Sequence, residues 1–464
     1  MKNFKQEVKP FEQLFAAFKS HGKQLYAVGG CIRDILLDTT PKDFDFCTDA
    51  TPTEIKEILA ANHLKVLPVG EEFGTIATII HKKSYEITTF RVRESYTRGS
   101  RHPVVVFGTS LARDLERRDL TINAMAMDGD GNIVDPLGGE ADLEAHILRV
   151  PESSYEKSIE IFSDDPLRML RLARFMGRLG FDVDPDADKA ARQCAPLILD
   201  VSRERWKAEI EGLLISKNAN LGLNWLMSCG ILPLILPETL ILSSTAAISA
   251  SLNIDETEPA QTGQSLWEQT LSLVSFVPAE TNLRWAALLH FLATPYCLRE
   301  QNAIGTAQLL QSMSDEILTR FKCSNEQRLY IRLLLTPFPK REIIPDKTTA
   351  RRMAIQLESA LKPWLQFNSS KIHILSDKTK ESSENNLQSW NNLFQSFIDD
   401  ENSIPVKLPD NISQYLQAQF NIRGKILGGV LNALRDAIID GHIPEGCKPD
   451  DCQAFVSQLL GNGN

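Results

Sequence analysis

The chain has 464 residues, of which 43% are apolar and 24% are charged, and its formal net charge is −10 at pH 7. This composition excludes a disordered or fibrous chain, and the length predicts several globular modules. The most apolar stretch, residues 230–252, is interrupted by Pro233, Pro237 and Glu238, so we expect no transmembrane segment. The eight cysteines are scattered without a CxxC pair, which excludes a disulfide framework and predicts a cytoplasmic protein.

The first motif is a predicted strand at residues 26–28, followed by Gly29 and Gly30 and by a predicted helix at residues 31–37. Two glycines allow the backbone to turn tightly, because neither carries a Cβ. Amide groups at the start of a helix favour anions, and Arg33 adds a planar cation that suits phosphate. The pattern predicts a turn that binds phosphate groups.

Two carboxylates follow this turn, Asp43 and Asp45, and one apolar residue, Phe44, separates them. On a strand both acids share one face, while Phe44 points into the core. Mg²⁺ prefers carboxylate, water and phosphate oxygens, and two such ions can clamp the oxygens of a phosphoryl displacement. A later predicted strand, residues 85–90, offers Glu86 as a third acid, with an exposed strand glutamate as the equal alternative.

Basic residues gather in two segments, residues 91–118 and 168–207. A local positive track of this kind is compatible with a negative net charge and is typical of proteins that contact nucleic acid. The first segment ends with Arg117 and Arg118, whose side chains could contact phosphate or ribose. Residues 119–127 are then mostly apolar, and their pattern predicts a helix.

A further helix is predicted at residues 164–175, where Asp165 offers an N-cap and Arg168, Arg171 and Arg174 recur at every third position. This spacing keeps the three cations near one face of the helix. A solvated charge stripe is the usual explanation of such a face. The repeated choice of arginine over lysine favours planar, bidentate contacts with bases or phosphates.

With these segments the chain resembles the class II tRNA nucleotidyltransferase and bacterial poly(A) polymerase family, over roughly residues 20–300. The family signature GGxxRD followed by DxD is matched by Gly29, Gly30, Arg33, Asp34, Asp43 and Asp45. The RRDxTxNA segment of the family is matched by Arg118, Asp119, Asn123 and Ala124. Its EDxxR base-reading motif aligns with Asp164, Asp165 and Arg168, so that aspartate stands where the family has glutamate.

The resemblance implies an α+β fold, with a polymerase-β-like nucleotidyltransferase head followed by an all-helical neck, body and tail that include a degenerate HD-type region. It implies that Asp43, Asp45 and Glu86 are catalytic and that the first two bind Mg²⁺. It also implies that the nucleotide is bound by Gly29, Gly30, Arg33, Asp34, Arg118, Asp119, Asn123, Asp165, Arg168, Arg171 and Arg174.

The expected division of the chain has five parts. These are a catalytic head at 1–147, a neck for base recognition at 148–214, a helical body with the HD-like region at 215–368, a loop or irregular insertion at 369–403, and a helical tail at 404–464 that contacts the tRNA elbow. In the body, Gln269 stands where the family has histidine and Phe291 where it has aspartate. We therefore expect neither a metal site nor phosphatase activity there.

The function implied by the resemblance is template-independent addition of CCA to the 3′ end of tRNA from CTP and ATP, with release of pyrophosphate. Residues 91–119 look like the full-length flexible loop of enzymes that add all three nucleotides, with Tyr96, Arg98, Gly99, Arg101, His102 and Pro103. The alternatives are a poly(A) polymerase, an enzyme that adds only CC or only A, and a non-catalytic tRNA-binding protein. The expected partners are the tRNA acceptor arm, CTP and ATP, with no membrane and no protein partner implied.

Overall fold

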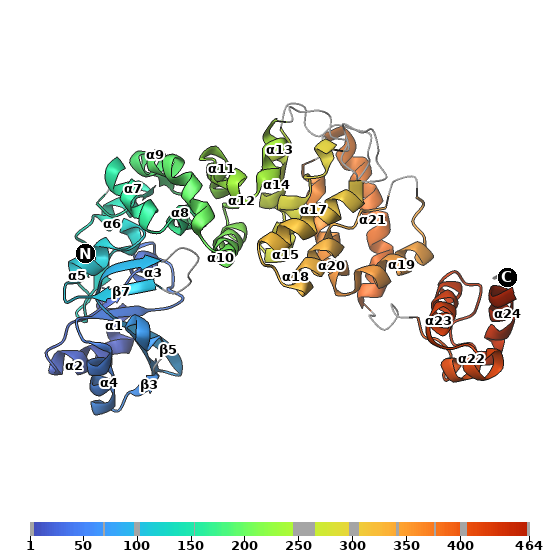
Figure 1. Ribbon diagram of the computed structural model, residues 1–464, viewed down its shortest axis with the longest axis horizontal. Helices are drawn as coiled ribbons and strands as arrows, with labels where there is room; N and C mark the ends of the chain where they lie inside the picture. Colours follow the sequence, from blue (N-terminus) through green and yellow to red (C-terminus); the bar gives the residue numbers. More distant parts are fainter. Residues whose placement is uncertain are drawn as a thin grey trace. The chain divides into compact units, whose positions relative to one another are not determined.

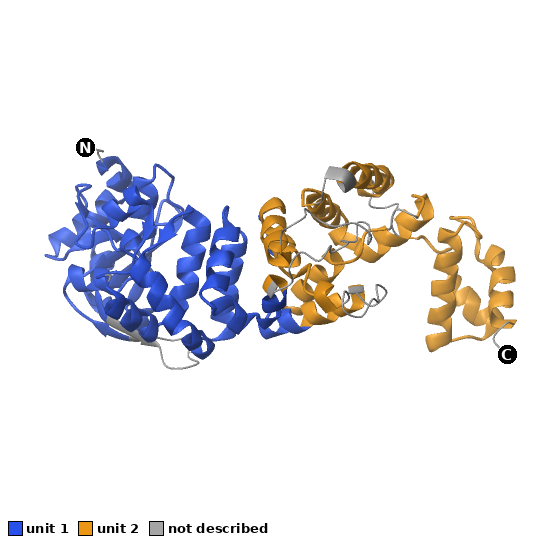
Figure 2. Ribbon diagram, turned by 90° about the horizontal axis from the view of Figure 1, so that it is seen from above, with its two compact units in different colours: residues 1–241, 279–281, 316–323 blue, residues 242–278, 282–315, 324–464 orange. Residues whose placement is uncertain are grey.

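The computed structural model describes residues 4–67, 70–96, 103–152, 154–244, 265–296, 306–339, 343–374, 377–399 and 406–461. The chain divides into two compact units, which Figure 2 shows in different colours. Unit 1 holds residues 1–241, 279–281 and 316–323, and unit 2 holds residues 242–278, 282–315 and 324–464. Among the described residues, every helix is too short or too polar to span a bilayer.

Unit 1 contains a seven-stranded sheet in the order β3-β4-β5-β2-β1-β8-β9 (Figure 1). Its strands are β1 Leu25–Val28, β2 Asp45–Thr48, β3 Lys65–Leu67, β4 Thr75–Ile80, β5 Lys83–Thr89, β8 Ala126–Met127 and β9 Ile133–Val134. Neighbouring strands are antiparallel except β2 and β5, which run parallel. The strands expected at residues 26–28 and 85–90 are both present, as β1 and β5.

The amino-terminal helices pack on this sheet through aromatic side chains. The ring of Phe11 lies 4.9 Å from the ring of Phe44 and 5.0 Å from that of Phe46, so Phe44, which is partly buried and precedes β2, packs at the edge of the core. Helices α2 Glu12–Ser20 and α4 Pro52–Ala61 both contact strands of the sheet. The sheet is thereby held rigid below the turn that carries the candidate site.

The rest of unit 1 is mostly helical, with a β6–β7 hairpin and a two-stranded β10–β11 pair. The strands are β6 Arg91–Tyr96, β7 Pro103–Phe107, β10 Ile147–Leu148 and β11 Asp182–Val183. The helices are α1 Lys5–Val8, α3 Gly30–Leu36, α5 Leu111–Glu116, α6 Gly139–Ala145, α7 Tyr155–Asp164, α8 Leu167–Leu179, α9 Pro185–Cys194, α10 Arg203–Leu214, α11 Ala219–Ser228, α12 Ile231–Ile235 and α13 Leu240–Ser244. Helix α8 packs against both α10 and α11, so the compact unit continues past residue 214, where the neck was expected to end.

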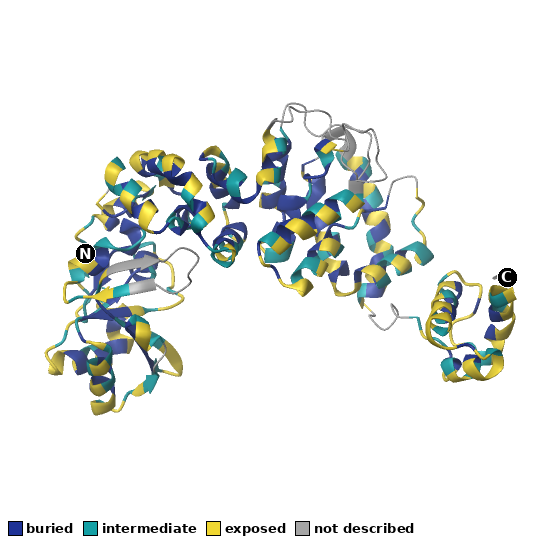
Figure 3. Cartoon of the chain, viewed as in Figure 1, coloured by how far each residue is buried: buried dark blue, intermediate teal, exposed yellow. Residues whose placement is uncertain are grey.

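Unit 2 is helical throughout its described residues. The remaining helices are α14 Leu266–Phe276, α15 Thr281–Leu289, α17 Thr306–Arg320, α18 Asn325–Leu334, α19 Lys347–Leu357, α20 Leu361–Ile372, α21 Asp377–Asp399, α22 Ile412–Phe420, α23 Gly424–Ile439 and α24 Gln453–Gly461, and unit 1 takes short parts of α15 and α17. Figure 3 shows buried residues along the inward faces of these helices. Trp285, Trp364 and Trp390 are fully buried.

Two expectations about secondary structure are wrong. Residues 117–127 do not form a helix but a turn, a short 3₁₀ segment and strand β8, because β8 pairs with β1 on one side and with β9 on the other. Residues 369–403 are not an irregular insertion, since α20 continues to Ile372 and α21 spans Asp377–Asp399. In α21 the buried side chains Trp390, Phe394 and Phe397 follow helical spacing, which outweighs the polar composition of the segment.

The expected flexible loop coincides with the β6–β7 hairpin and the following helix α5. The hairpin strands pair from Arg91 opposite Phe107 to Tyr96 opposite Pro103. Arg98, Gly99, Arg101 and His102, which carried part of the resemblance, lie outside the described residues.

Candidate active site

The turn after β1 is built so that two guanidinium groups approach its backbone closely. Gly29 has a φ of +81°, which favours glycine, and a Cβ on this residue would lie 3.1 Å from the Arg118 side chain. A Cβ on Gly30 would lie 3.2 Å from Arg33. The two glycines therefore give the turn its shape and leave room for two cations beside it.

Arg33 is nearly fully buried, and its guanidinium is engaged by other side chains of unit 1. Its Nε and Nη2 donate to Asp34 Oδ1 at 2.9 and 2.7 Å, and its Nη1 donates to Asn123 Oδ1. Asp34 also accepts a hydrogen bond from Arg178 at 3.0 Å. These contacts fasten helix α3 to the segment around Asn123 and to helix α8. In this structure Arg33 thus positions the turn and does not present its donors to a ligand.

The acids lie on the neighbouring strands of the sheet. Asp45 is the first residue of β2 and stands opposite Glu86 in the parallel pairing with β5. Asp43 precedes the strand by two residues, and all three side chains belong to exposed residues. Partial desolvation raises the pKa of Asp45 above its ordinary value, Glu86 and Asp43 raise it further, and Arg118 opposes the rise.

The acids form a site with excess negative charge that suits a divalent cation. Mg²⁺ is commonly held by one or two carboxylates together with water and substrate phosphates, which matches the acids available here. A closed set of three or more acidic, histidine or cysteine ligands is not found among the described residues. Asp43 and Asp45 can therefore hold a metal together with phosphate oxygens, and they do not form a complete protein cage.

Asp119 connects the segment after α5 to helix α8. Its side chain accepts hydrogen bonds from Arg171 at 2.9 and 2.6 Å and from Asn123 at 3.0 Å. Burial alone would raise the pKa of Asp119, but Arg171 and Asn123 outweigh it and hold the pKa well below its ordinary value. Asp119 is thus a fixed anion that orients Arg171, one of the three predicted arginines.

The predicted base-reading residues lie together at the start of α8, each with a protein partner. Asp165 accepts hydrogen bonds from Arg205 at 3.2 and 3.0 Å. Arg168 donates to the backbone carbonyl of Arg117 at 2.7 Å. Asp164, which replaces the glutamate of the family motif, is exposed at the end of α7.

The last of the three arginines pairs with helix α10. Arg174 donates to Glu209 at 2.6 Å, and its guanidinium lies 4.6 Å from the centre of the Phe175 ring. Since Arg171 also approaches Glu209 at 3.7 Å, a single buried carboxylate holds both cations. Arg171 and Arg174 therefore join α8 to α10 and to the segment around Asp119 through ion pairs in this structure.

Sequence reasoning missed four side chains that position the predicted residues. Arg178 holds Asp34, Arg205 holds Asp165, Glu209 holds Arg174, and Asp114 holds Arg117 and Arg118. For Asp114 a signal was present, since Arg117 and Arg118 follow it by three and four residues, the spacing of helical ion pairs. The others are distant in sequence from their partners and carried no such signal.

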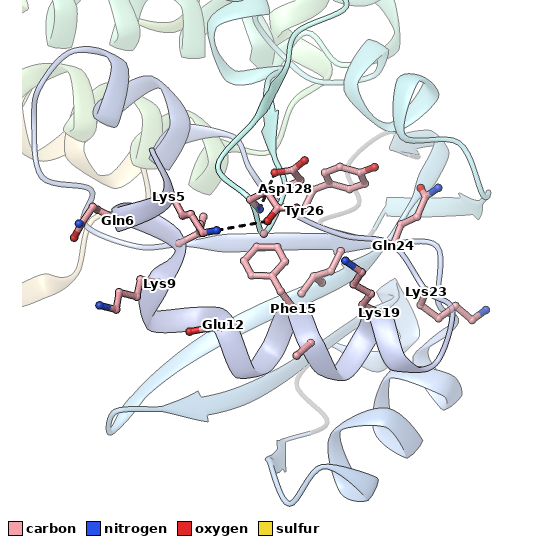
Figure 4. Close-up of a pocket in the computed structure, with 15 residues that line it drawn as sticks. Lys5, Gln6, Lys9, Glu12, Phe15, Lys19, Lys23, Gln24, Tyr26 and Asp128 are labelled. Atoms are coloured by element: carbon pink, nitrogen blue, oxygen red, sulfur yellow. Dashed lines mark hydrogen bonds and ion pairs between the residues drawn. The ribbon is translucent and has the colours of Figure 1, made fainter. Parts of the chain in front are cut away.

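A cavity of about 660 Å³ lies elsewhere on unit 1, beside α1, α2 and the beginning of β1. Figure 4 shows the residues that line it, among them Lys5, Lys9, Lys19 and Lys23. None of the predicted site residues lines this cavity. The candidate active site is therefore defined by the turn, the acids and the arginines described above.

In unit 2, the residues that were compared with an HD-type site are buried in the helical core. Gln269 and Phe291 are both nearly inaccessible. His290 is partly buried, and its inaccessible Nδ1 has no hydrogen-bond partner among the described residues. Burial lowers the pKa of His290, and the nearby Lys371 lowers it further. A lysine beside the histidine disfavours a cation at this place.

Comparison with protein families places two segments of the chain. Residues 25–149 match the poly A polymerase head domain, and residues 180–242 match the probable RNA and SrmB-binding site of polymerase A. Both matched segments lie mainly within unit 1; the first contains the turn and the acids, whereas Asp165, Arg168, Arg171 and Arg174 fall between the two segments. Nucleotidyltransferases of this kind generally use a divalent metal, which agrees with the acidic cluster.

Similar proteins occur in bacilli. The chain is 40% identical over 218 residues to a CCA-adding enzyme of Bacillus licheniformis, which covers 47% of this chain and 53% of the relative. It is 40% identical over 193 residues to a CCA-adding enzyme of Bacillus subtilis, covering 42% and 47% of the two chains. The chain thus spans about half the length of the curated relatives it matches.

The fold extends further than these sequence matches. The crystal structure of the Bacillus stearothermophilus CCA-adding enzyme in complex with CTP superposes with a TM-score of 0.67 and 25% identity, over 98% of each chain. This similarity confirms the predicted fold class, a nucleotidyltransferase head followed by helical domains. It also confirms the resemblance on which the sequence motifs were assigned.

Proposed function

We propose that this chain, whose head belongs to the poly A polymerase head-domain family, adds cytidine, cytidine and adenosine to the 3′ end of tRNA. The observation that carries the proposal is the placement of Asp45 opposite Glu86, at the end of the sheet where β1 leads into the Gly29–Gly30 turn. Acids and a phosphate-sized turn at one place are the parts that nucleotidyl transfer requires. The similarity to a CCA-adding enzyme along nearly the whole chain supports tRNA, CTP and ATP as substrates.

In this mechanism Asp43 and Asp45 would hold Mg²⁺, with Glu86 beside them. When bound, Mg²⁺ would supply the positive charge that favours attack by the terminal 3′-hydroxyl of tRNA and that neutralises the leaving pyrophosphate. Gly29 and Gly30 let the triphosphate approach the backbone, and Arg118 supplies positive charge next to the turn. Asp45 acts in its ionised form, so its raised pKa favours activity at neutral rather than acidic pH.

Selection of the base follows from the hydrogen-bonding groups of Asp165 and Arg168. Cytosine and adenine each present an exocyclic amine next to a ring nitrogen that accepts, whereas uracil and guanine present an oxygen next to a ring N–H. A carboxylate beside a guanidinium therefore forms complementary hydrogen bonds with cytosine and adenine. In uracil and guanine the carboxylate would face an oxygen, which has no hydrogen to donate. To do so, Asp165 exchanges Arg205 for the base, and Arg168 exchanges the carbonyl of Arg117.

The parts of the chain take corresponding roles in this proposal. The head at 1–147 carries the chemistry, the neck at 148–214 presents the base-reading residues, and the helical body at 215–368 is a vestigial HD-type domain. The tail at 404–464 contacts the tRNA elbow. The hairpin and helix at 91–119 permit the change from cytidine to adenosine addition. We expect the enzyme to work in the cytoplasm, where tRNA, CTP and ATP are present.

The test uses tRNA transcripts that end before CCA, after C and after CC, with CTP and ATP supplied separately and together with Mg²⁺. Products are resolved at single-nucleotide length. Addition that stops at CCA on all three transcripts is the expected result. Long adenosine tracts would make the protein a poly(A) polymerase, extension of one transcript would make it a CC- or A-adding enzyme, and binding without extension would leave a non-catalytic tRNA-binding protein.

A further inference from the structure

A single buried carboxylate, Asp114, joins the root of the β6–β7 hairpin to the arginines beside the nucleotide turn. It is 1% exposed and lies in helix α5. Its oxygens accept hydrogen bonds from the backbone N–H of Arg91 at 3.0 Å, from Arg117 at 3.0 and 2.7 Å, and from Arg118 at 3.0 Å. All four bonds converge on a group that the sequence motifs did not include.

The partners of Asp114 lie at two functionally different places. Arg118 reaches the turn, where its Nη1 stands 3.1 Å from the position of a Cβ on Gly29. Arg91 is the first residue of strand β6, and its side chain donates to the carbonyl of Phe73 at 2.7 Å. A change in the position of Asp114 would therefore move the cation at the turn and the start of the hairpin together.

The charge of Asp114 is fixed by its surroundings. Burial would raise the pKa of its carboxyl, but Arg118 and Arg117 outweigh burial and hold the pKa below its ordinary value. The carboxylate is thus ionised at any pH at which the enzyme works. An uncharged side chain of the same shape would leave the largely buried guanidinium of Arg118 without its principal anion, as an uncompensated charge that is no longer held in this position.

We propose that Asp114 is a positioning residue, which holds Arg118 against the Gly29–Gly30 turn so that the turn accepts the triphosphate, and which fixes the hairpin root to the same point. This proposal rests on the proposed nucleotidyltransferase function. It assigns to Asp114 an effect on nucleotide binding that a purely stabilising ion pair does not have. tRNA binding does not depend on Asp114 in this scheme.

Asp114→Asn tests the proposal, because the amide oxygen can still accept from Arg91 while the negative charge is lost. The KM for CTP should rise ~10-fold or more, since a charged hydrogen bond is lost, and the KM for tRNA should stay within ~2-fold. Asp114→Glu keeps the negative charge, so its KM for CTP should lie between the values of the wild type and of Asp114→Asn. Glu238→Gln, which removes the carboxylate paired with Arg320 at 2.7 and 2.8 Å outside the head, is the matched control for loss of an ion pair.

Nucleotide binding measured without tRNA separates the two claims. If the wild type binds CTP with Mg²⁺ but extends no tRNA, the proposed function fails and the role of Asp114 is still tested by the affinity of Asp114→Asn for CTP. An unchanged CTP affinity in this variant would overturn the positioning role. The positioning role is also overturned if Asp114→Asn and Glu238→Gln lower the melting temperature alike and leave the KM for CTP unchanged. If Asp114→Asn does not fold, the affinity of Asp114→Glu for CTP is measured instead. An unchanged affinity in that variant would overturn the positioning role.

A second, independent observation concerns the thiols of the tail. Cys447 and Cys452 lie with their sulfur atoms 3.8 Å apart across a five-residue step, and Cys452 belongs to a buried apolar cluster with Leu416 and Val456. Cys447 is partly accessible. A disulfide requires a sulfur separation of about 2 Å, which a rotation of two side chains in one short turn can supply.

We infer that a peroxide converts this pair into a disulfide. The accessible Cys447 thiolate attacks the peroxide and becomes a sulfenic acid with release of water or alcohol, and the thiol of Cys452 then displaces water to close the S–S bond. Two thiols lose two electrons and two protons, and the peroxide takes them up. The bond would close the turn that leads into helix α24.

The test exposes the full-length protein to hydrogen peroxide and measures intact mass and a peptide map. The expected result is loss of two hydrogen atoms, mapped to a bond between Cys447 and Cys452 and reversed by dithiothreitol. Cys447→Ser should abolish this loss, and Cys452→Ser should instead leave an oxidised Cys447. Addition of oxygen to the wild type without a bond between the two, or the same mass loss in either variant, would overturn the inference.

Discussion

Asp45 stands directly opposite Glu86 in the parallel pairing of β2 and β5, and both residues are exposed at the surface. Side chains opposite one another on neighbouring strands point to the same face of the sheet. The fold therefore forces two carboxylates together without a protein cation between them in ion-pair contact among the described residues. An arrangement that destabilises the free protein in this way is typical of a site that a cation completes.

The first prediction concerns Asp45→Asn. Loss of this carboxylate should lower nucleotide incorporation at least ~100-fold, because a metal ligand is removed. Affinity for tRNA should be nearly unchanged, since Asp45 lies at the catalytic end of the head. Incorporation is measured with CTP on tRNA lacking CCA, and affinity by filter binding. Asp130→Asn, which changes an exposed aspartate of the same unit, should keep full activity.

The second prediction is a gain in stability from Glu86→Gln in the absence of metal. The substitution removes the charge that, after desolvation, contributes most to the raised pKa of Asp45. We expect the free energy of unfolding to rise by about 0.5 kcal/mol at pH 7, while activity falls. Calorimetry with and without Mg²⁺ provides the measurement. A variant that is less stable than the wild type without metal would show that Glu86 supports the sheet and not the site.

Parts of unit 1 could be predicted because their signals are local. The strand predicted at 26–28 is present as Leu25–Val28, and the helix predicted at 164–175 is present as Leu167–Leu179, although it begins after Pro166 and Asp164 ends the preceding helix. The helix predicted within residues 117–127 is absent because this segment pairs with β1, which lies about 100 residues earlier in the chain. No local sequence pattern indicates such a pairing. The helix Asp377–Asp399 was missed because serine and asparagine dominate its exposed face, although its aromatic residues keep helical spacing.

The candidate site was likewise only partly predictable from local sequence signals. Motifs indicated which residues belong to it, but not which of them are already engaged by protein partners. Arg33 fits phosphate by chemistry, and yet its donors are used by Asp34 and Asn123, which only the folded chain reveals. Likewise Arg205 holds Asp165 from 40 residues away. Long-range ion pairs of this kind depend on tertiary packing and have no signature in a single sequence.

The third prediction concerns base selection by Asp165. Asp165→Asn can present an N–H as well as an oxygen, so the variant should lose its bias against bases that offer an oxygen. We expect kcat/KM for CTP to fall ~10- to 100-fold, the cost of one charged hydrogen bond, and the ratio of UTP to CTP use to rise. Competition between the two nucleotides on tRNA lacking CCA gives the ratio. A uniform fall for both nucleotides would instead assign Asp165 a general structural role.

The fourth prediction uses the ion pair between Asp119 and Arg171. Asp119→Asn removes the nearer anion of Arg171, whose side chain is 35% exposed and keeps only the longer contact with Glu209 at 3.7 Å, so the substitution should lower the free energy of unfolding by about 1 kcal/mol at pH 7. The folded-state pKa of Asp119 lies below its unfolded value, so the contribution is present above pH 4 and is lost as the pH falls further. Urea unfolding should therefore give a constant difference between pH 8 and pH 5. A difference that already shrinks between these values would contradict the assignment.

The last prediction concerns Lys371, which is buried in α20 of unit 2 with no carboxylate in ion-pair distance among the described residues. Its ammonium lies 5.4 Å from the centre of the Phe367 ring, and burial lowers its pKa from 10.5 to about 7. The unfolded chain thus binds this proton more tightly than the folded chain. The contribution of Lys371 to stability should therefore improve as the pH rises from about 7 to 10.5.

Lys371→Met should remove this dependence and raise the free energy of unfolding of the helical unit by on the order of 3 kcal/mol at pH 7, because a charged group leaves an apolar core. Lys362→Met, on the exposed face of the same helix, is the matched control and should change stability by less than about 0.5 kcal/mol. Thermal unfolding between pH 6 and 10 compares the three proteins. Equal pH profiles for the wild type and Lys371→Met would mean that Lys371 reaches water in solution, and the buried cation beside His290 would then not be a feature of the folded body.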